Sequence, residues 1–271
     1  MTDQQATDLG DAQSTLFIPL TARARETRRS RPALRDPKAV EILQAVSFDD
    51  VYDGKGWGGF ITIPRTLILD HWVRGFLSRD PGGTVVELGT GLNTRFERAG
   101  NGTAHWIDLD LPDVIELRRR FFADTGRRTM IAASLAGEDW LEVVAGLPGP
   151  YFFVADGVLP YVEPADVEAT LGRIAARFPG AGLAFDTYPA RVLAMQHQRA
   201  AKTGMAARWA WACDDPKTLG RHGLTLVESA SVTSPPPALR RTLPARYRHL
   251  LPLAGPLLGD AIGHVSLFRA G

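Results

Sequence analysis

The sequence predicts an α/β fold, with helices on both faces of a mostly parallel β-sheet. Short apolar runs alternate with longer stretches of helical spacing from residue 84 onward, which is the pattern of parallel strands joined by helices. Each of these runs ends in polar or glycine-rich sequence, as expected where strands reach the ligand-binding edge of such a sheet. The 271 residues and the hydrophobic fraction of 45% provide for one large domain with an appendage.

The chain before the sheet is predicted to form a helical cap at residues 16–80, after a disordered N-terminus at residues 1–15. The Arg-rich stretch 16–44 has helical character, and residues 49–59 predict a glycine-rich loop. A further helix is expected to begin at Pro64, because proline suits the first helical turn.

The sheet is predicted within a core of residues 81–271. Five strands are expected in chain order, at residues 84–88, 104–108, 129–133, 151–155 and 182–186. Helical stretches such as 113–126 and 164–178 separate them. Two strand-like runs follow in the tail, at 223–230 and 264–269, without a full helix between them, and they are compatible with a closing antiparallel pair.

Composition excludes several classes of protein. The charges nearly balance, with 31 Lys+Arg against 30 Asp+Glu, which argues against a nucleic-acid partner. The single cysteine, Cys213, excludes a disulfide framework and a Cys-rich zinc site, and no metal-ligand spacing is present. Without a visible signal sequence or an apolar run long enough for a membrane span, we expect a cytoplasmic protein with no membrane partner. Nothing in the sequence indicates an oligomeric state.

The near-neutral total hides an uneven distribution of charge. Residues 81–188 carry 9 basic and 15 acidic side chains, and residues 189–271 carry 11 basic and 4 acidic ones. Two interpretations are equally open. The two parts offset each other across a folded interface, or they mark one site for a cationic ligand and another for an anionic one.

A glycine-rich turn follows the first predicted strand, with the pattern Glu87-x-Gly89-x-Gly91. The glycines allow a tight turn and a close approach of a ligand to the backbone. An acidic residue before the turn is unfavourable for a pyrophosphate, and Thr94 stands where a dinucleotide fingerprint requires its third glycine. The pattern therefore suits S-adenosylmethionine, whose ribose and amino acid carry no phosphate, better than a nicotinamide dinucleotide.

Two carboxylates follow the second predicted strand. Asp108 and Asp110 lie 17 and 19 residues after Gly91, close to the spacing at which an acid binds the ribose hydroxyls of a nucleoside. Asp110 also precedes Pro112, so a helix-capping role is an alternative for this residue. Together, the two acids support a nucleoside site at this edge of the sheet.

Several segments in a fixed order carry a family resemblance. They are ARARETRR (22–29), LRDPKAVEIL (34–43), PRTLILD (64–70), VVELGTGLNTRF (85–96), DLDLPDVIELRRR (108–120), ASLAGEDWL (133–141) and ADGVLPYV (155–162). On these segments the chain resembles the leucine carboxyl methyltransferase superfamily, and especially its bacterial branch of polyketide carboxyl O-methyltransferases. The resemblance covers residues 20–190 well and implies a Rossmann-like class I S-adenosylmethionine-dependent methyltransferase.

The resemblance implies roles for individual cofactor-binding residues. Asp110 would hold the ribose hydroxyls, and Ser134 lies where the family lines the adenine, often with an Asp-Leu pair. Arg65, with either Arg23 or Arg25, would pair with the methionine carboxylate, and Asp156 replaces the usual glutamate beside the methionine portion. The full expected cofactor set is Arg25, Arg65, Glu87, Gly89, Gly91, Asp108, Asp110, Ser134, Leu135, Asp156 and Gly157.

The acceptor is expected to be a small anionic molecule under a lid at residues 189–215. A carboxylate is ionised at pH 7 and needs no general base, so its methylation depends on alignment and the exclusion of water. Candidate catalytic residues are Tyr161, Tyr188 and His197, and candidate acceptor-binding residues are Arg191, Arg199, Arg208, Trp209 and Trp211. The alternatives are a phenolic or other hydroxyl acceptor with His197 as base, a nicotinamide oxidoreductase, and a non-catalytic binding protein.

Overall fold

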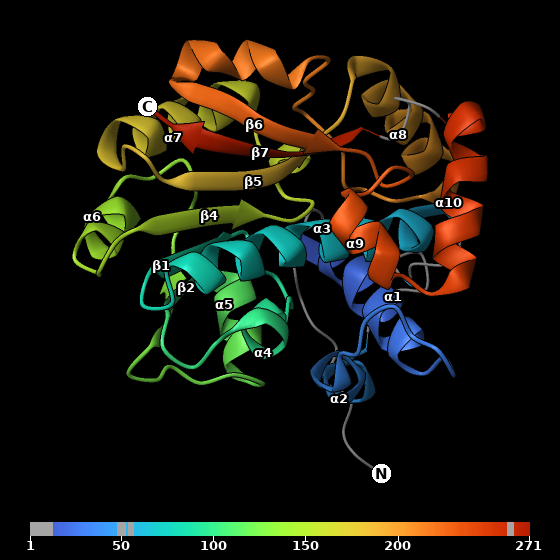
Figure 1. The fold of residues 1–271 in the computed structure, drawn as a ribbon, viewed down its shortest axis with the longest axis horizontal. Coiled ribbons are helices and arrows are strands. Elements are labelled where there is room, and N and C mark those ends of the chain that lie inside the picture. Colours follow the sequence, from blue (N-terminus) through green and yellow to red (C-terminus); the bar gives the residue numbers. More distant parts are fainter. Residues whose placement is uncertain (1–12, 48–52, 54–56, 259–262) are drawn as a thin grey trace.

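The computed structural model describes residues 13–47, 53, 57–258 and 263–271. Within these residues the chain forms a seven-stranded sheet in the order β3-β2-β1-β4-β5-β7-β6 (Figure 1). The strands are β1 (Thr84–Leu88), β2 (His105–Asp110), β3 (Arg128–Ala132), β4 (Tyr151–Ala155), β5 (Gly182–Thr187), β6 (Leu224–Ala230) and β7 (His264–Ala270). The five strands predicted before the tail are confirmed, with ends that differ by at most two residues.

The strands run as the sequence predicts. β1 pairs in parallel with β2 and β4, and the parallel set extends to β3 and β5. β7 lies antiparallel between β5 and β6, so the expected closing antiparallel pair is confirmed. The mostly parallel, Rossmann-like sheet therefore brings the carboxyl ends of β1 to β5 to one edge.

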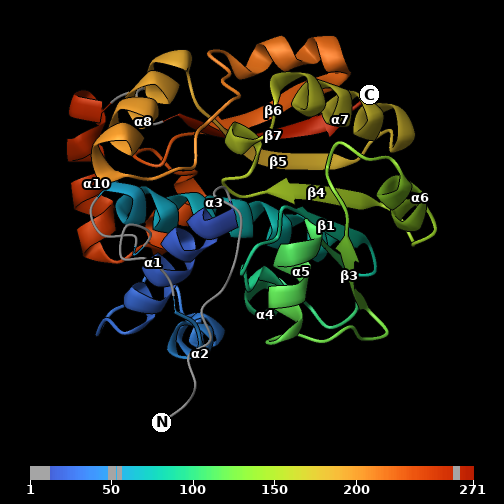
Figure 2. The same ribbon diagram turned by 180° about the vertical axis from the view of Figure 1, so that it is seen from behind.

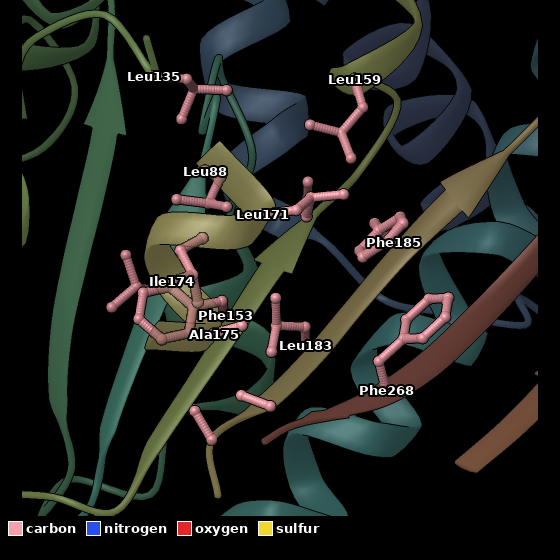
Figure 3. Close-up of a cluster of buried hydrophobic side chains, with 14 of the residues drawn as sticks. Leu88, Leu135, Phe153, Leu159, Leu171, Ile174, Ala175, Leu183, Phe185 and Phe268 are labelled. Atoms are coloured by element: carbon pink, nitrogen blue, oxygen red, sulfur yellow. The ribbon is translucent and has the colours of Figure 1, made fainter. Parts of the chain in front are cut away.

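Helices cover both faces of the sheet (Figures 1 and 2). On one face, α6 (Asp139–Ala145) and α7 (Pro164–Arg177) pack on a core that includes Val86 and Phe153. Figure 3 shows this cluster, in which Leu171 and Ile174 of α7 point toward the strands. On the other face, α3 (Trp57–Arg79) packs on Val85 and its neighbours. Successive residues of one strand thus point to opposite faces of the sheet and contact the two helical layers.

The helical cap contains α1 (Phe17–Thr27) and α2 (Pro37–Ala45). The Asp36 carboxylate caps α2 by accepting a hydrogen bond from the Ala39 N–H at 2.9 Å. The disorder predicted for residues 1–15 falls mainly on residues 1–12, which lie outside the described part. The last of these fifteen residues enter a short 3₁₀ helix, η1 (Gln13–Leu16).

The predicted start of α3 at Pro64 is wrong. The helix begins at Trp57, which puts Pro64 inside it and makes the end of the predicted glycine-rich loop helical. Proline removes one backbone hydrogen bond from a helix, but Ile63, Leu67 and Ile68 are buried against the sheet, and this packing outweighs local propensity. Of the rest of the predicted loop, residues 49–52 and 54–56 lie outside the described residues.

The prediction of no full helix between the last two strands is also wrong. In the chain, α9 (Pro237–Thr242) and α10 (Ala245–Leu258) follow β6 and precede β7. Both helices cover the same face of the sheet as α3. Pro252 inside α10 conceals the helix in the sequence, because proline is typical of helix ends. None of the described helices is both long and apolar enough to cross a bilayer.

The remaining elements position the ligand-binding edge. α4 (Arg95–Ala99) follows the glycine-rich turn, and α5 (Pro112–Arg119) follows β2. The predicted lid region contains α8 (Ala190–Thr203), which ends at Gly204 with a φ of 73°. Two short 3₁₀ helices, η3 (Leu159–Tyr161) and η4 (Pro216–His222), complete the described fold.

Candidate active site

A cavity of about 680 Å³ lies at the carboxyl edge of the parallel strands. This volume is within the range of small-molecule sites, about 300–1,000 Å³. Its wall is formed by η1, α1 and α3 on one side, by the turns after β1 to β5, and by α8 with the segment that follows it. Of the expected residues, the wall includes Arg65, Gly89, Gly91, Asp110, Ser134, Leu135, Asp156, Gly157, Tyr161, Tyr188, Arg199 and Trp209.

The turn after β1 requires glycine. Gly89 and Gly91 have φ values of 62° and 50°, in the left-handed region that other residues rarely adopt. A Cβ atom on Gly89 would lie 2.4 Å from the Cγ1 atom of Val158. The turn after β1 can therefore pass under the cavity only if residues 89 and 91 carry no side chain.

Asp110, at the end of β2, presents its carboxylate at the cavity wall. Its Oδ2 accepts a hydrogen bond from the Gly91 N–H at 2.6 Å, and its Oδ1 accepts one from the Leu111 N–H at 2.8 Å. Burial raises the pKa of this carboxyl to about 6, although the two backbone donors act in the opposite direction. The carboxylate is thus held rigidly across the glycine turn, with lone pairs left for donors in the cavity.

Asp108 lies on the same strand but does not line the cavity. Its carboxylate is fully buried and pairs with Arg118 at 3.1 Å and Arg128 at 2.6 Å. Thr90 also donates a hydrogen bond to it at 3.1 Å. The two acids of the predicted ribose site are therefore separated by the structure, and only Asp110 of the two faces the cavity.

A buried ionic network lies beneath the cavity and centres on Arg95. The guanidinium of Arg95 is inaccessible to solvent and contacts Asp70 and Asp156, each at 2.8 Å, and also Glu87. Arg98 joins the network through its own ion pair with Asp70, at 3.0 Å. Three elements are joined here, because the acids come from α3, β1 and the end of β4.

Glu87 belongs to this network and does not line the cavity. Its Oε1 accepts a hydrogen bond from the Asn93 side chain at 2.6 Å and also bonds Arg95. Burial raises the pKa of Glu87 to about 7, although the charge of Arg95 lowers it. The acid before the glycine turn thus supports the turn from below.

Arg65 of α3 lies at the cavity wall and is held by two acids. Its Nε donates to Asp156 at 2.6 Å, and its Nη1 donates to Asp186 and to the Tyr188 hydroxyl, both at 3.2 Å. Asp186 also accepts a hydrogen bond from the Gly157 N–H at 2.7 Å. The Nη2 nitrogen of Arg65 makes no hydrogen bond within the described residues, so this one nitrogen of the guanidinium is available to an anion.

Arg23, rather than Arg25, lines the cavity. The Arg23 side chain is buried and donates to Asp36 at 2.9 Å and to the Leu92 carbonyl at 2.8 Å. Arg25 instead donates to the carbonyl of Asp53 at 2.8 Å and is largely exposed. Helical residues two positions apart point about 200° from each other around the axis, which explains the difference.

Three aromatic side chains form one part of the wall. The ring of Trp209 lies between Tyr188 and Tyr161, with centroid distances of 4.5 and 6.2 Å. Burial raises the pKa of both tyrosines above that of a free phenol, and nearby Asp186 raises that of Tyr188 further. Both hydroxyls therefore stay protonated at neutral pH and can donate hydrogen bonds.

The candidate residues of the predicted lid, residues 189–215, divide into two groups. Arg199 of α8 and Trp209 line the cavity, whereas His197 lies outside it and bonds the carbonyl of Trp209 through Nε2 at 2.7 Å. The structure places the other three expected residues outside the cavity wall. Arg191 is exposed, and Arg208 bonds the carbonyls of Met205 and Ala207. Trp211 is buried in the core on the α7 face of the sheet.

Sequence reasoning missed the partners of the arginines. Asp70 and Asp186 are separated from Arg95 and Arg65 by 25 and 121 positions, and although Asp70 ends the family segment 64–70, nothing in the sequence assigns either acid a partner. The one available signal was Asp186 at the end of a predicted strand, where site residues gather. Such ion pairs become visible only when the elements are packed together.

Comparisons with known proteins agree with this geometry. The leucine carboxyl methyltransferase family model matches residues 17–175. The chain is 33% identical to the tetracenomycin polyketide synthesis O-methyltransferase TcmP of Streptomyces glaucescens, over 84% of this chain and 86% of that one. It is 27% identical to an S-adenosyl-L-methionine-dependent methyltransferase of Gibberella zeae, over 81% of each chain. A proposed methyltransferase from Thermobifida fusca shares the fold, with a TM-score of 0.60 and 20% identity over 92% of this chain and 94% of that one.

Proposed function

Because the chain belongs to the leucine carboxyl methyltransferase family and is an S-adenosylmethionine-dependent O-methyltransferase, we propose that its acceptor is the carboxylate of a small aromatic or polyketide-like molecule. Family membership sets aside the nicotinamide oxidoreductase, and the relatives named as methyltransferases favour an enzyme over a non-catalytic member of the family. The choice between a carboxylate and a hydroxyl acceptor depends on the chemistry of the cavity wall.

The cavity residues fit the cofactor. S-Adenosylmethionine carries a carboxylate, an ammonium group, a sulfonium centre and a ribose with two hydroxyls. Arg65 has an unengaged Nη2 nitrogen for the carboxylate, Asp156 supplies negative charge, and Asp110 can accept hydrogen bonds from the ribose. The turn at Gly89 is a cradle that a Cβ atom would fill. We propose that these residues, with Arg23 and Gly91, hold the cofactor.

The single observation that carries the carboxylate acceptor is that the described wall of the cavity holds aspartates but no nitrogen or sulfur base to take a proton from a phenol. When bound, S-adenosylmethionine supplies an electrophilic methyl group. No histidine, lysine or cysteine lies among the described residues of the wall. Asp156 is fixed between Arg65 and Arg95, which hold its pKa below the usual range against the effect of burial. An acceptor that is already ionised at pH 7 needs no base, and a carboxylate meets this condition.

The shape of the wall supports an aromatic acceptor. Beside Tyr161, Tyr188 and Trp209, apolar side chains line the cavity from η1, α1, α3, α8 and the segment after α8: Leu16, Ile18, Pro19, Ile61, Val192, Met195 and Met205. Flat apolar molecules pack well against such residues. Arg199 is the lid's cationic residue on the described wall and is the proposed anchor for negative charge on the acceptor.

The dependence of the rate on pH tests this function. We expect kcat to change less than about threefold between pH 6.5 and 9, because no proton leaves a carboxylate in the reaction. The His197→Ala variant should show a profile of the same shape, since His197 holds the lid backbone and does not line the cavity. His222→Ala, at the end of η4 and outside the cavity, is the control for a general effect of losing an imidazole. A kcat that rises with pH in the wild type and falls in His197→Ala would favour the hydroxyl acceptor.

Cofactor affinity is expected to depend on the ionisation of Asp110. Its pKa is raised to about 6, so the proton returns as the pH falls through 6, and a protonated carboxyl accepts the ribose hydroxyls poorly. We expect the affinity for S-adenosylhomocysteine, measured by calorimetry, to fall about tenfold between pH 7.5 and 5. Asp110→Asn should bind more weakly and lose this dependence, whereas Asp113→Asn, outside the cavity, should retain it. A pH dependence that persists in Asp110→Asn would contradict the assignment.

A further inference from the structure

The expected adenine side of the cavity carries no charge on its turn at residues 134–136. Ser134, an uncharged residue, lines the cavity beside Leu135 and Ala136. The Ser134 hydroxyl accepts a hydrogen bond from the Ala136 N–H at 3.2 Å, so it stabilises its own turn. An adenine bound here would present an exocyclic amino group, which is a hydrogen-bond donor that needs an acceptor. The Ser134 oxygen keeps one lone pair but carries no charge, so a nearby carboxylate would be the stronger acceptor.

Asp166, in the first turn of α7, lines the same cavity. Helix α7 is fixed to the 134–136 turn by two contacts. Thr170 donates to the Leu135 carbonyl at 3.0 Å, and Arg173 donates to the Ala136 carbonyl at 2.9 Å. Asp166 precedes Thr170 by four residues, so the two side chains lie on one face of the helix. The Asp166 carboxylate is thereby placed one helical turn from Thr170, toward the carboxyl edge of the sheet.

The carboxylate of Asp166 has no partner of its own. It makes no side-chain hydrogen bond or ion pair within the described residues, whereas Glu168 on the same helix pairs with Arg221 at 2.7 Å. A purely structural explanation is that Asp166 caps α7, because acids are favoured in the first turn of a helix. The side chain nevertheless bonds no backbone N–H of that turn, and its half-buried position at the cavity wall is not needed for an interaction with the helix dipole.

We propose that Asp166 accepts a hydrogen bond from the exocyclic amino group of the adenine, and that it supplies from α7 the charged acceptor that Ser134 does not provide. The site would then discriminate against a cofactor whose base has a carbonyl oxygen in place of that amino group, because two acceptors would face each other. Asp166 is therefore a determinant of base specificity. The inference rests on the cofactor and is independent of the methyl acceptor.

Binding of two ligands that differ only at this group tests the proposal. The affinities of the wild type for S-adenosylhomocysteine and for its deaminated form, S-inosylhomocysteine, are measured by calorimetry. We expect the wild type to prefer the adenosyl ligand by about 10- to 100-fold, as for a hydrogen bond to a charged acceptor. Asp166→Ala should reduce this preference to less than about threefold, mainly through weaker binding of the adenosyl ligand. Asp166→Asn should also reduce it, because its amide can donate to the inosine oxygen.

Glu168→Ala is the matched control. It removes an acid from the same helix that does not line the cavity, and it should keep the full preference of the wild type. Thermal unfolding of each variant shows whether α7 is intact. A preference that survives in Asp166→Ala, or a wild type that binds both ligands equally, would overturn the proposal. Neither result bears on the carboxylate acceptor, because no acceptor is present in the experiment.

Discussion

Replacing Arg95 with methionine is expected to lower the free energy of unfolding by about 3–5 kcal/mol at pH 7.5. Arg95 is wholly buried, and its guanidinium is shared by Asp70, Glu87 and Asp156. Methionine fills much of the volume but leaves three buried carboxylates with less compensating charge, and a buried unpaired charge is far more costly than an exposed one. Thermal or denaturant-induced unfolding of the purified variant measures the loss, which corresponds to roughly 10 °C in Tm.

The pH dependence of this loss and a matched variant make the test specific. Glu87 has a pKa of about 7 in the folded protein, so at pH 5 it carries a proton and adds no charge. The cost of losing Arg95 should therefore be smaller at pH 5 than at pH 7.5. Arg74→Met removes a half-exposed arginine that lies 3.7 Å from Asp70, and it should change the stability by less than about 0.5 kcal/mol. Equal effects of the two substitutions would contradict the role of the network.

Replacing Arg65 with lysine is expected to weaken the binding of S-adenosylhomocysteine by about 10- to 100-fold. Lysine keeps the positive charge between Asp156 and Asp186, so the fold should be retained. It cannot present the planar pair of N–H groups with which a guanidinium binds a carboxylate. Calorimetry with the purified variant measures the change in affinity.

A ligand that lacks the amino-acid part of the cofactor shows whether Arg65 acts on the carboxylate alone or on the binding site as a whole. Methylthioadenosine has the adenine, ribose and sulfur of the cofactor but no carboxylate, and its affinity should change less than about threefold in Arg65→Lys. Arg25→Lys is the control, because Arg25 bonds the Asp53 carbonyl and does not line the cavity. Equal weakening of both ligands in Arg65→Lys would show that Arg65 does not contact the carboxylate.

Much of the fold is predictable from the sequence, because parallel strands buried on both faces leave clear apolar runs. β1 and β4 match their predicted bounds, Thr84–Leu88 and Tyr151–Ala155. The two failures, at Pro64 and in α10, have one cause. Proline and glycine predict helix ends locally, whereas burial against the sheet maintains α3 through Pro64, and α10 is anchored in the core at Leu251, next to Pro252.

The site is predictable in part, for a related reason. Residues next to strand ends, such as Gly89 and Asp110, follow from sequence order and lie on the cavity wall. The direction in which a helical or strand side chain points is harder to predict from the sequence. Asp108 and Asp110 are two apart on one strand, yet one pairs with buried arginines and the other faces the cavity. Long-range partners such as Asp186 for Arg65 depend on the packing of distant elements.

The stability of the methylated product to alkali tests the carboxylate acceptor most directly. The protein is incubated with methyl-labelled S-adenosylmethionine and either a polycyclic aromatic carboxylic acid or the matching phenol without the carboxyl group. A methyl ester is cleaved by mild alkali, whereas a methyl ether is not. The account predicts label on the carboxylic acid only, released completely as methanol by mild alkali. Alkali-stable label, or transfer to the phenol at an equal or greater rate, would contradict it.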